Sequence, residues 1–495
     1  MLATKSGFYN FIKEPVFLTF IASVLLSLLA ISGTVTIGKD GAFYVDIARS
    51  ISDHGISVAF ERFNWPWLSI LIAGVHNLTK VNHELIAYFL VVFFMAGTCS
   101  LTVSMVKRNT PKAVYWAVLL VLSVPVFNEF RAEIIRETGF WFFIVLTVWL
   151  VIKKNNVSFL NGLFIQGAIV CATLFRSEAL FIVPSIFIYL LIDRRCVNFR
   201  AKSLNLIKTF SVFFLILLAG LCFFIFTQMG SDVLEQGRIR RVLKLINPYR
   251  IYESFLFISE KFAQVVLAKW SQSDATTIVF FGFLIALIIR IISYAGLASL
   301  LLLDSTGRKG LIEGAKEYRL NIISIAVYFL ILLIFFFQAK FINSRHSALL
   351  LILSIPILAV AVYNVSLKWP KLVKVIIALS LLLMFANVIS TSTKKTHYLE
   401  AAYWVQENTK TTDKVYYEDS RVAYYAGRGY PSMPLFAKIV KNKVSIEDYD
   451  YFVIESGLDN KDFVSWAKEN NLIIVAERSN GKRIIFILAN KRMMP

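Results

Sequence analysis

An acidic residue follows the first long apolar run of the chain, at a position where it could act as a general base. The run covers about residues 16–37, and Asp40 stands before the helix-like stretch FYVDIARSISDHG. A carboxylate held at a membrane surface can take a proton from an acceptor hydroxyl or amine. The same position also suits a helix N-cap, in which the carboxylate accepts hydrogen bonds from free backbone N–H groups. Position alone favours the cap.

Two later polar turns between apolar runs combine arginines with acids. The stretch NEFRAEIIRET (128–138) contains Glu133 and Arg136, and Arg176 with Glu178 forms the next such turn. Mutual salt bridges would make these turns tolerable near lipid, and we favour that interpretation for the two glutamates. A guanidinium group also suits bidentate phosphate binding. Arg136 and Arg176 are therefore candidate phosphate ligands.

A third polar stretch has the pattern of a cationic amphipathic helix. In GRIRRVLKLINPYRIYESF (237–255), Arg238, Arg241 and Lys244 recur three residues apart and share one helix face, with apolar residues opposite. This pattern is typical of a helix that lies in the membrane interface. The helix could bind lipid headgroups in general, or Arg238 and Arg241 could hold a lipid-linked phosphate.

A fourth polar stretch, QAKFINSRHSALL (338–350), places Arg345 and His346 at the start of an apolar run. A single histidine there is more often a polar helix-start residue than a metal ligand. The chain contains no HExxH, GxxxxGK[ST] or GxSxG motif, and the missing phosphate loop weighs against an ATP-driven pump. Its four cysteines lie in or beside apolar stretches and form no metal-ligand spacing. We predict no metal site and no cofactor, and leave dependence on a divalent metal open.

The composition indicates a membrane protein. Apolar types make up 57% of the 495 residues and charged types 17%, although 52 Lys and Arg against 32 Asp and Glu give a formal charge of +20. Soluble domains contain about 45–50% apolar residues. A nucleic-acid-binding surface needs a more polar protein behind it. We therefore exclude a disordered chain and a nucleic-acid-binding protein.

Eleven apolar runs approach or exceed the roughly 18–20 residues that span a hydrocarbon core. The first lacks a convincing cleavage site and is interpreted as an uncleaved anchor. We predict a polytopic α-helical membrane protein with about eleven transmembrane helices, give or take one or two. One of them contains Arg290. The runs are 16–37, 84–106, 113–128, 138–152, 159–175, 178–192, 207–227, 276–303, 320–337, 347–364 and 371–391.

Loop charge predicts the orientation of these spans. With the N-terminus in the cytoplasm, about one cytoplasmic residue in four is Lys or Arg, against about one in seven in the outside loops. The principal outside loops are then 38–83, 128–138 and 228–275. Most of the excess positive charge therefore reflects the orientation of the chain in the membrane and not a binding surface. An odd number of spans places the chain after residue 391 outside the cell or in the periplasm.

The tail differs from the rest of the chain in composition. KKTHYLEAAYWVQENT (394–409) is helix-like, and four strand-like segments follow at 414–417, 450–455, 472–477 and 483–488. We predict a small extracytoplasmic α/β domain at 392–495, after a membrane domain at 1–391.

Taken in order, the polar motifs resemble bacterial glycosyltransferases of the GT-C superfamily. KDGAFYVDIARSISDHG followed by WPWLSILIAG resembles their opening, more narrowly that of the group including protein O-mannosyltransferases and the lipid A aminoarabinose transferase. FRAEIIRETGFWFF resembles an Arg-acid segment of this group, TLFRSEAL a later Arg-acid turn, and SRHSALLL a span start. The tail YLEAAYWVQENTKTTDKVYYEDSRVAYYAGR is similar to the outside domain of many bacterial members.

The resemblance implies a GT-C-like fold and a hexosyl- or pentosyltransferase at the outer face of the bacterial inner membrane. Such an enzyme moves a sugar from a polyprenyl-phosphate-linked donor to a glycolipid, polysaccharide or protein acceptor. By the family's pattern the catalytic base falls on Asp40. Many members have two adjacent acids here, but this chain has Gly41, so Asp46 or Glu61 would have to supply a second carboxylate.

Cations from the outside loops would hold the donor phosphate in such an enzyme, where fixed guanidinium groups stabilise the charge that develops on the leaving group. The residues implied are Arg62, Lys80, Arg136, Arg176, Arg345 and His346, with Arg238 and Arg241 from the amphipathic stretch.

Two other functions are compatible with the same residues. A transporter or flippase of a lipid-linked sugar also needs basic groups near the headgroup plane, but it commonly has repeated halves and charges at the membrane midplane. Arg290 would favour this alternative if it faced a central cavity. An O-antigen ligase or polymerase-like transferase is the second alternative, because such enzymes have a long outside loop comparable to 228–275.

Overall fold

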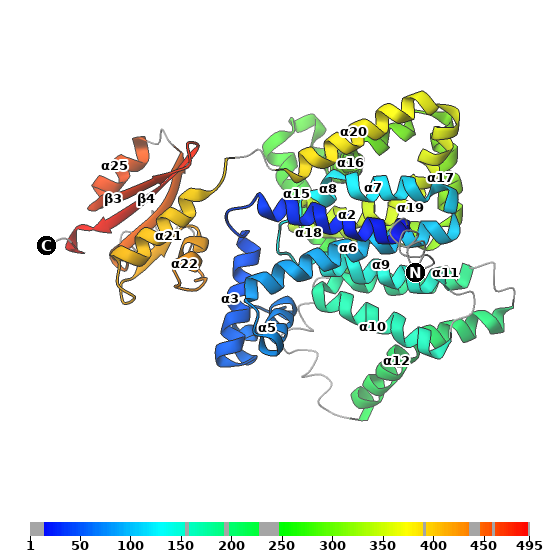
Figure 1. The fold of residues 1–495 in the computed structure, drawn as a ribbon, viewed down its shortest axis with the longest axis horizontal. Coiled ribbons are helices and arrows are strands. Elements are labelled where there is room, and N and C mark those ends of the chain that lie inside the picture. The colour runs from blue at the N-terminus through cyan, green and yellow to red at the C-terminus, as the bar shows by residue number, and fades with distance from the viewer. Residues whose placement is uncertain are drawn as a thin grey trace, which may run out of the picture. The chain divides into compact units, whose positions relative to one another are not determined.

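The computed structural model describes residues 14–153, 158–192, 198–226, 247–389, 393–434, 446–457 and 461–493. Within them the chain is mostly helical and has one four-stranded sheet near its C-terminus (Figure 1). Arg238 and Arg241 lie outside the described residues.

The predicted apolar runs form helices. Most helix bounds lie within about five residues of the predicted run, but one helix begins at Phe199, well before the predicted start at 207. These helices are α2 (Pro15–Ser32), α6 (His83–Asn109), α9 (Glu137–Lys153), α10 (Phe159–Phe175), α11 (Ile182–Ile192), α12 (Phe199–Phe226), α18 (Arg319–Ala339), α19 (Ser344–Lys368) and α20 (Pro370–Val388).

Three predicted spans are divided into shorter helices. The run 178–192 forms the 3₁₀ helix η2 (Ser177–Phe181) and α11. The run 113–128 forms α7 (Val114–Ser123) and α8 (Pro125–Asn128), because Pro125 supplies no backbone donor and its ring disfavours helical backbone at Val124. The run 276–303 forms α16 (Ala275–Tyr294) and the 3₁₀ helix η4 (Gly296–Leu302), separated where Gly296 adopts a φ of +55°.

Six helices in the described part of the chain are long and apolar enough to cross a membrane. They are α2, α6, the segment Lys269–Tyr294, α18, α19 and α20, and several shorter apolar helices accompany them. This bears out a multi-span helical membrane protein. The total of eleven spans and their orientation stay predictions.

The chain divides into two compact units. The helical unit comprises Met1–Leu25, Phe93–Phe130 and Arg136–Asn387, and the mixed unit comprises Leu26–Val92, Arg131–Ile135 and Val388–Pro495. The tail therefore forms one compact body with the segment that holds Asp40, an association that composition did not indicate.

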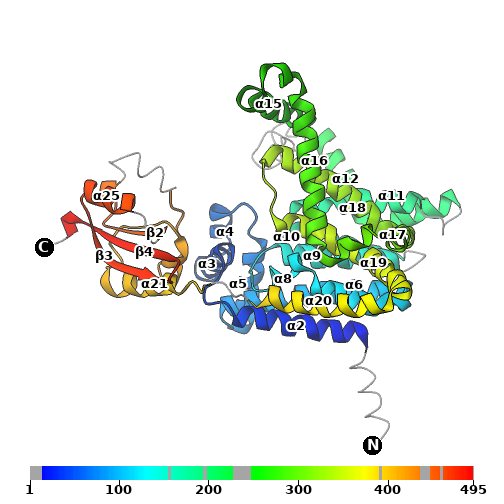
Figure 2. The same cartoon turned by 90° about the horizontal axis from the view of Figure 1, so that it is seen from above.

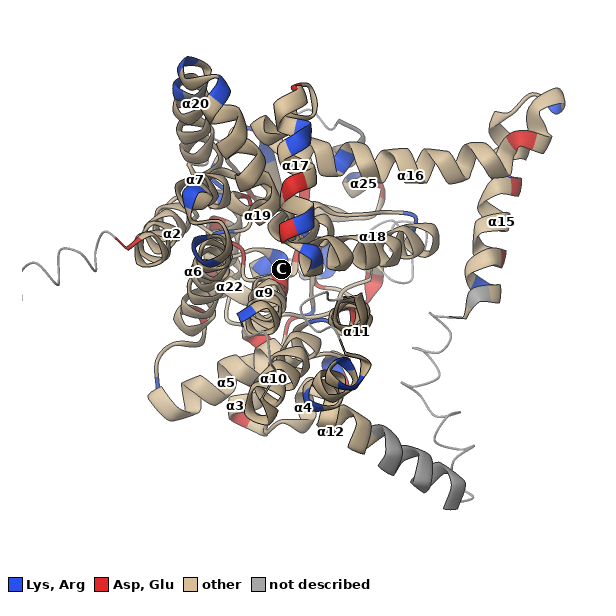
Figure 3. Cartoon of the chain, turned by 90° about the vertical axis from the view of Figure 1, so that its right-hand side faces the viewer, with Lys and Arg blue, Asp and Glu red and all other residues tan. Residues whose placement is uncertain are grey.

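Small residues allow close helix packing in the helical unit. The helix α17 (Ser305–Glu317) carries Gly310 and Gly314, where an added Cβ would lie 2.7 Å from the Ala361 backbone and 2.8 Å from the Ile357 carbonyl of α19. Glycines at such contacts let two backbones approach. Acidic and basic residues follow one another along α17 (Figure 3). The helix α15 (Pro248–Val266) is followed by the 3₁₀ helix η3 (Lys269–Asp274) and then by α16. The helix α15 packs on α16.

The first outside segment folds into three helices of the mixed unit. They are α3 (Lys39–His54), α4 (Ser57–Arg62) and α5 (Trp67–Thr79). The helix predicted for FYVDIARSISDHG is confirmed as part of α3. This helix buries an apolar face that includes Val45, Ile47 and Ala48. Ser69 on α5 donates a hydrogen bond to the Tyr44 carbonyl, at 2.9 Å, and ties α5 to α3.

The tail contains the predicted α/β structure. Helix α21 (Thr396–Asn408) precedes β1 (Val415–Tyr417), followed by α22 (Ser420–Tyr425), β2 (Tyr451–Gly457), α25 (Lys461–Glu469), β3 (Leu472–Ser479), β4 (Arg483–Asn490) and the 3₁₀ helix η5 (Lys491–Met493). The strand order is β1-β2-β4-β3, with β1 parallel to β2 and the other pairs antiparallel.

Helices pack on both faces of this sheet, because apolar side chains of its strands point to both faces (Figure 2). Val415, Val453 and Ile487 pack against α21 and α22, whereas Phe452 and Phe486 face α25. Successive strand residues point to opposite faces, so β1, β2 and β4 are buried on both sides. The α/β structure predicted for the tail is confirmed, with the sheet between two helical layers.

Candidate functional site

A charged cluster lies where four helices of the helical unit begin or end. Arg176 follows α10, Glu178 lies in the 3₁₀ helix η2 (Ser177–Phe181), Glu137 begins α9, and Arg345 is in the first turn of α19. Arg176 forms ion pairs with both glutamates, including a 2.6 Å contact from its Nη2 to Glu178 Oε1. Arg345 Nε lies 3.5 Å from Glu137 Oε1. We call these four residues and Arg136 the arginine cluster.

The two arginines on Glu137 differ in their surroundings. Arg176 holds carboxylates on both sides and its side chain is 11% exposed, whereas the Arg345 side chain is 29% exposed. Arg176 would have to exchange an ion pair to bind phosphate, so its geometry suits positioning of Glu137 and Glu178. The salt bridge that we favoured for Glu178 is present. Arg345 is the more accessible cation.

Arg136 also belongs to this cluster. It immediately precedes Glu137, is half-buried and contributes a favourable charge interaction to Glu178. Three arginines therefore meet two glutamates. A further carboxylate, Glu129, accepts a 3.3 Å hydrogen bond from Ser344 and forms no ion pair within the described ranges.

Aromatic side chains line the buried side of the cluster. The Tyr328 ring packs against Phe181 with a centroid distance of 4.7 Å and against Phe140 at 6.2 Å. Tyr328 also donates a hydrogen bond to the His346 carbonyl, at 3.0 Å. Because few water molecules can approach from this side, the charge interactions are screened little.

His346 has a structural role at the start of α19. Asn343 is the N-cap, and its backbone N–H donates to His346 Nδ1 at 3.4 Å, which completes a capping box. The ring is buried near Phe335. This agrees with a polar helix-start residue, and within the described ranges no group of three or more His, Cys, Asp or Glu side chains is arranged to hold a metal ion.

In the mixed unit, Asp40 lies inside the first turn of α3. Gly38 is the N-cap and Lys39 the first helical residue, so the alternative in which Asp40 itself caps the helix is wrong. Asp40 is half-buried, and its charge is stabilised by the positive end of the helix dipole. Burial, together with the charges of Asp419 and Asp40, raises the pKa of Tyr430 to about 12, so Asp40 lies within electrostatic reach of that phenol.

Close packing at Gly41 explains why this chain has no second adjacent acid. A Cβ at residue 41 would lie 2.8 Å from Ile37 Cγ1 and 3.0 Å from Ile134 Cβ. Ile134 thus occupies the space that an acidic side chain would need.

We expect Gly41→Ala to lower the free energy of unfolding by about 1–3 kcal/mol, the usual cost of overpacking. Gly74 in α5 has no heavy atom near its would-be Cβ and provides the matched control. Thermal unfolding of the purified protein in detergent measures both variants. Equal melting temperatures for Gly41→Ala and Gly74→Ala would show that residue 41 has room for a side chain.

Another carboxylate lies beside the start of α3. A Cβ at Gly38 would be 2.1 Å from Glu133 Oε2, so the Glu133 side chain fills the space next to the N-cap. Glu133 and Gly38 also line one small cavity of about 190 Å³. The sequence favours a salt bridge for Glu133 within its own turn. Its position makes it a better candidate for the second carboxylate than the two acids suggested by sequence.

Those two acids lie elsewhere in the mixed unit. Asp46 is buried and accepts a 2.7 Å ion pair from Arg62, which also donates to Ser50 and to the Tyr430 carbonyl. This network joins α3 and α4 to the tail. All the Arg62 contacts named here are with other residues of the protein. Glu61 is exposed on α4.

Lys80 is the exposed C-cap of α5, with a φ of +59°. The phosphate roles assigned to Lys80 and Arg62 stay predictions.

A buried ion pair anchors the tail near Asp40. Arg421 donates two hydrogen bonds to Asp419, at 3.0 and 2.8 Å, and Lys39 Nζ lies 3.1 Å from the same carboxylate. Burial acts to raise the pKa of Asp419, but the Arg421 hydrogen bonds and charge outweigh it and lower the pKa from 3.8 to about 2.

This lowered pKa predicts a defined loss of stability in acid. Because the folded-state pKa is depressed, the contribution of Asp419 is fully present above about pH 4 and is lost as the pH falls through about 2. Asp419→Asn leaves Arg421 buried without its charge partner and should cost about 3–5 kcal/mol at neutral pH. Between pH 5 and 2.5, the free energy of unfolding should fall less steeply with pH in the variant than in the wild type. Parallel pH curves would remove Asp419 from this effect.

Two solved structures align with almost the whole chain. The crystal structure of ArnT from Cupriavidus metallidurans in the apo state has 12% sequence identity and a TM-score of 0.41, and the alignment covers 95% of this chain and 97% of that one. The same protein bound to undecaprenyl phosphate has 10% identity and a TM-score of 0.43, with the same coverage. No family model matches the chain, and comparison with curated proteins gives no match.

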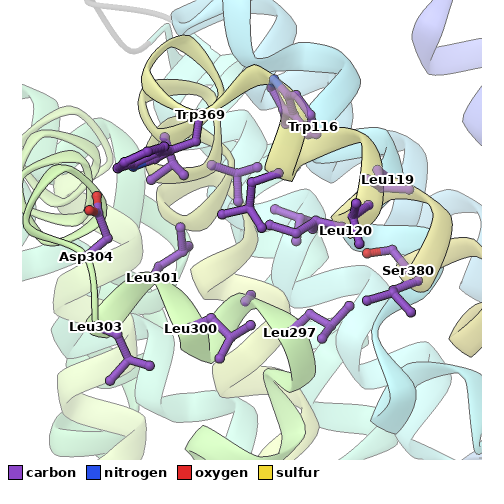
Figure 4. A pocket seen from close by; sticks show the side chains of 17 residues that line it. Trp116, Leu119, Leu120, Leu297, Leu300, Leu301, Leu303, Asp304, Trp369 and Ser380 are labelled. Carbon is purple, nitrogen blue, oxygen red and sulfur yellow. The ribbon is translucent and has the colours of Figure 1, made fainter.

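Arg290 donates a hydrogen bond to the Ile342 carbonyl, in the loop before α19. It therefore has a backbone partner at a loop. An apolar cavity of the helical unit, of about 430 Å³, is lined by other residues, among them Trp116, Asp304 and Trp369 (Figure 4). Arg290 provides no support for the transporter alternative.

The sequence indicated no site role for Glu137 beyond a possible salt bridge in the stretch 128–138, and it did not indicate the Asp419–Arg421 pair. Glu137 gave a usable signal, because it stands directly before a long apolar run, where an acid favours a helix N-terminus. Asp419 and Arg421 gave none, because only the folded tail buries them together.

Proposed function

We propose that the chain is a membrane glycosyltransferase that transfers a sugar from a polyprenyl-phosphate-linked donor to a glycolipid, polysaccharide or protein acceptor. We place the reaction at the outer face of the bacterial inner membrane, with the N-terminus in the cytoplasm and the tail outside. In this proposal the lipid bilayer supplies the donor, and no cofactor is needed.

The observation that carries the proposal is the arginine cluster. Ionised side chains at the ends of apolar helices are costly unless they are paired or used. Three arginines meet two glutamates in this cluster, and the more exposed of the two ion-paired arginines is Arg345, whose side chain is 29% exposed. A phosphate leaving group requires such fixed cations.

Asp40 supports the chemical step. The acceptor hydroxyl or amine loses its proton to the Asp40 carboxylate and forms a bond to the anomeric carbon of the donor. The bond from that carbon to the lipid phosphate oxygen breaks, and its electron pair leaves with the phosphate. Arg345 and Arg136 stabilise the resulting charge, whereas Arg176 keeps Glu137 and Glu178 in place.

The direct test compares cells with and without the gene by mass spectrometry of lipid-linked sugars and envelope glycans. We expect one polyprenyl-phosphate sugar to accumulate in the deletion and one glycan modification to disappear. Purified protein given that donor and envelope lipids should release free polyprenyl phosphate. Accumulation without release by the purified protein would indicate a flippase, and accumulation of a polyprenyl-diphosphate oligosaccharide would indicate a ligase or polymerase.

A further inference from the structure

The mixed unit contains a second cationic site, separate from the arginine cluster. A cavity of about 430 Å³ is lined by residues from α3, the start of α21, α22, β2 and the β3–β4 hairpin. Its cations are Lys39, Lys395, Arg421, Lys482 and Arg483, with Glu455 as the one acidic residue among the lining side chains. The smaller cavity beside Gly38 shares Lys395 and Arg421 with it.

A tight turn fixes the position of two of these cations. Gly481, at the tip of the β3–β4 hairpin, has a φ of +82°, a backbone conformation that glycine adopts without strain. The Asn480 side chain accepts hydrogen bonds from the backbone N–H groups of Lys482 and Arg483, at 3.1 and 2.9 Å. Asn480 also donates to the Lys394 carbonyl, at 3.3 Å. The hairpin and the segment before α21 are therefore held together.

Ion pairs within the protein leave several of these cations uncompensated. Asp419 pairs with the buried Arg421 and with the exposed Lys39. Lys395, Lys482 and Arg483 form no ion pair within the described ranges. Like charges brought together by a fixed turn repel one another unless an anion lies between them.

A buried histidine in the wall has an unused polar atom. His397 is 1% exposed, and its Nε2 lies 3.2 Å from Glu455 Oε1. Its Nδ1 has no hydrogen-bond partner among the described residues. Buried polar atoms without a partner are rare in folded proteins. The cavity thus contains both excess positive charge and an unsatisfied polar atom.

We propose that this cavity binds a phosphate group carried on a small polar molecule or headgroup. The volume is too large for a single inorganic ion and suits a phosphorylated glycerol or sugar. The exposed side chains of Lys482, Arg483 and Lys39 provide charge-assisted hydrogen bonds, and the buried Arg421 adds positive potential. The site goes beyond the proposed glycosyl transfer, because binding there requires neither Asp40 nor the arginine cluster.

Calorimetric titration of the full-length protein tests this site. We expect glycerol 3-phosphate to bind to protein in phosphatidylcholine nanodiscs, with affinity that falls as salt increases. The double variant Lys482→Ala/Arg483→Ala should bind at least about tenfold more weakly, because two charge-assisted contacts are lost. Both side chains are exposed, so the variant should melt at the wild-type temperature.

The double variant Lys410→Ala/Lys468→Ala is the matched control, since both residues are exposed cations of the tail outside the cavity. It should bind like the wild type. Equal affinity in both double variants, equal weakening in both, or no binding by the wild type would overturn the proposal.

A second titration, in nanodiscs of different lipid composition, identifies the source of the phosphate. If membrane lipids occupy the site, adding phosphatidylglycerol to the nanodiscs should abolish binding of soluble glycerol 3-phosphate to the wild type. If the ligand is a soluble phosphate ester, the affinity should be the same in both nanodiscs. Each result supports the site and assigns its ligand to one source.

Discussion

Asp40→Asn should reduce sugar transfer by at least about a hundredfold, because a positioned general base typically contributes between about a hundredfold and ten-thousandfold in rate. The amide has nearly the same shape as the carboxylate but cannot accept the acceptor proton. Asp40 is half-buried in the first turn of α3 and does not cap the helix. The variant should therefore insert, melt and bind donor as the wild type does. The measurement is release of polyprenyl phosphate from the accumulated donor, at saturating donor concentration.

Asp53→Asn provides the matched control. Asp53 lies on the same helix, is exposed, and should tolerate the same change without loss of rate. Normal turnover by Asp40→Asn would remove Asp40 from the mechanism. Glu133 would then be the next residue to test, since its side chain lies beside the N-cap of α3.

Arg345→Ala should weaken donor binding by roughly ten- to a hundredfold, because a hydrogen bond to a charged group contributes about 1.5–3 kcal/mol. Arg136→Ala should act in the same direction. Neither change should affect acceptor binding to the same extent. Arg250→Ala is the control, because this exposed cation on α15 lies outside the arginine cluster. Donor affinity is measured by titration of the isolated polyprenyl-phosphate sugar.

Arg176→Ala should give a different result from Arg345→Ala. It leaves Glu137, whose side chain is 4% exposed, beside only the more distant Arg345. Removing one partner of a buried ion pair costs about 3–5 kcal/mol. The main effect should therefore be loss of folded protein. Donor affinity unchanged in Arg345→Ala and Arg136→Ala, or a stable Arg176→Ala with lost donor binding, would reverse the roles that we assign.

The local structure of the tail was predictable. Each strand-like segment has alternating or continuous apolar residues bounded by polar ones, and each forms a strand within a few residues of the predicted ends. The apolar runs likewise predicted helices, except where Pro125 and Gly296 break them. Such patterns are local, so they can be recognised without knowledge of the fold.

Pairing within the candidate sites was only partly predictable. The Arg176–Glu178 pair is two residues apart in sequence and was expected, but the pairing of both with α9 and α19 depends on helix packing. The ion pair between Asp46 and Arg62 was not predicted, because the sequence suggested separate roles for them as a second acid and a phosphate ligand.

The sequence by itself determined that the chain is a multi-span helical protein with a mixed α/β tail, because run length and side-chain periodicity depend on neighbouring residues. The tertiary structure decided how the charged residues are used. Arg176 pairs with two glutamates, Ile134 fills the space at Gly41, and the β3–β4 hairpin brings Lys482 and Arg483 to Arg421. The energy of a charge depends on its distance from other charges and from water, and for residues far apart in sequence only the folded chain sets those distances.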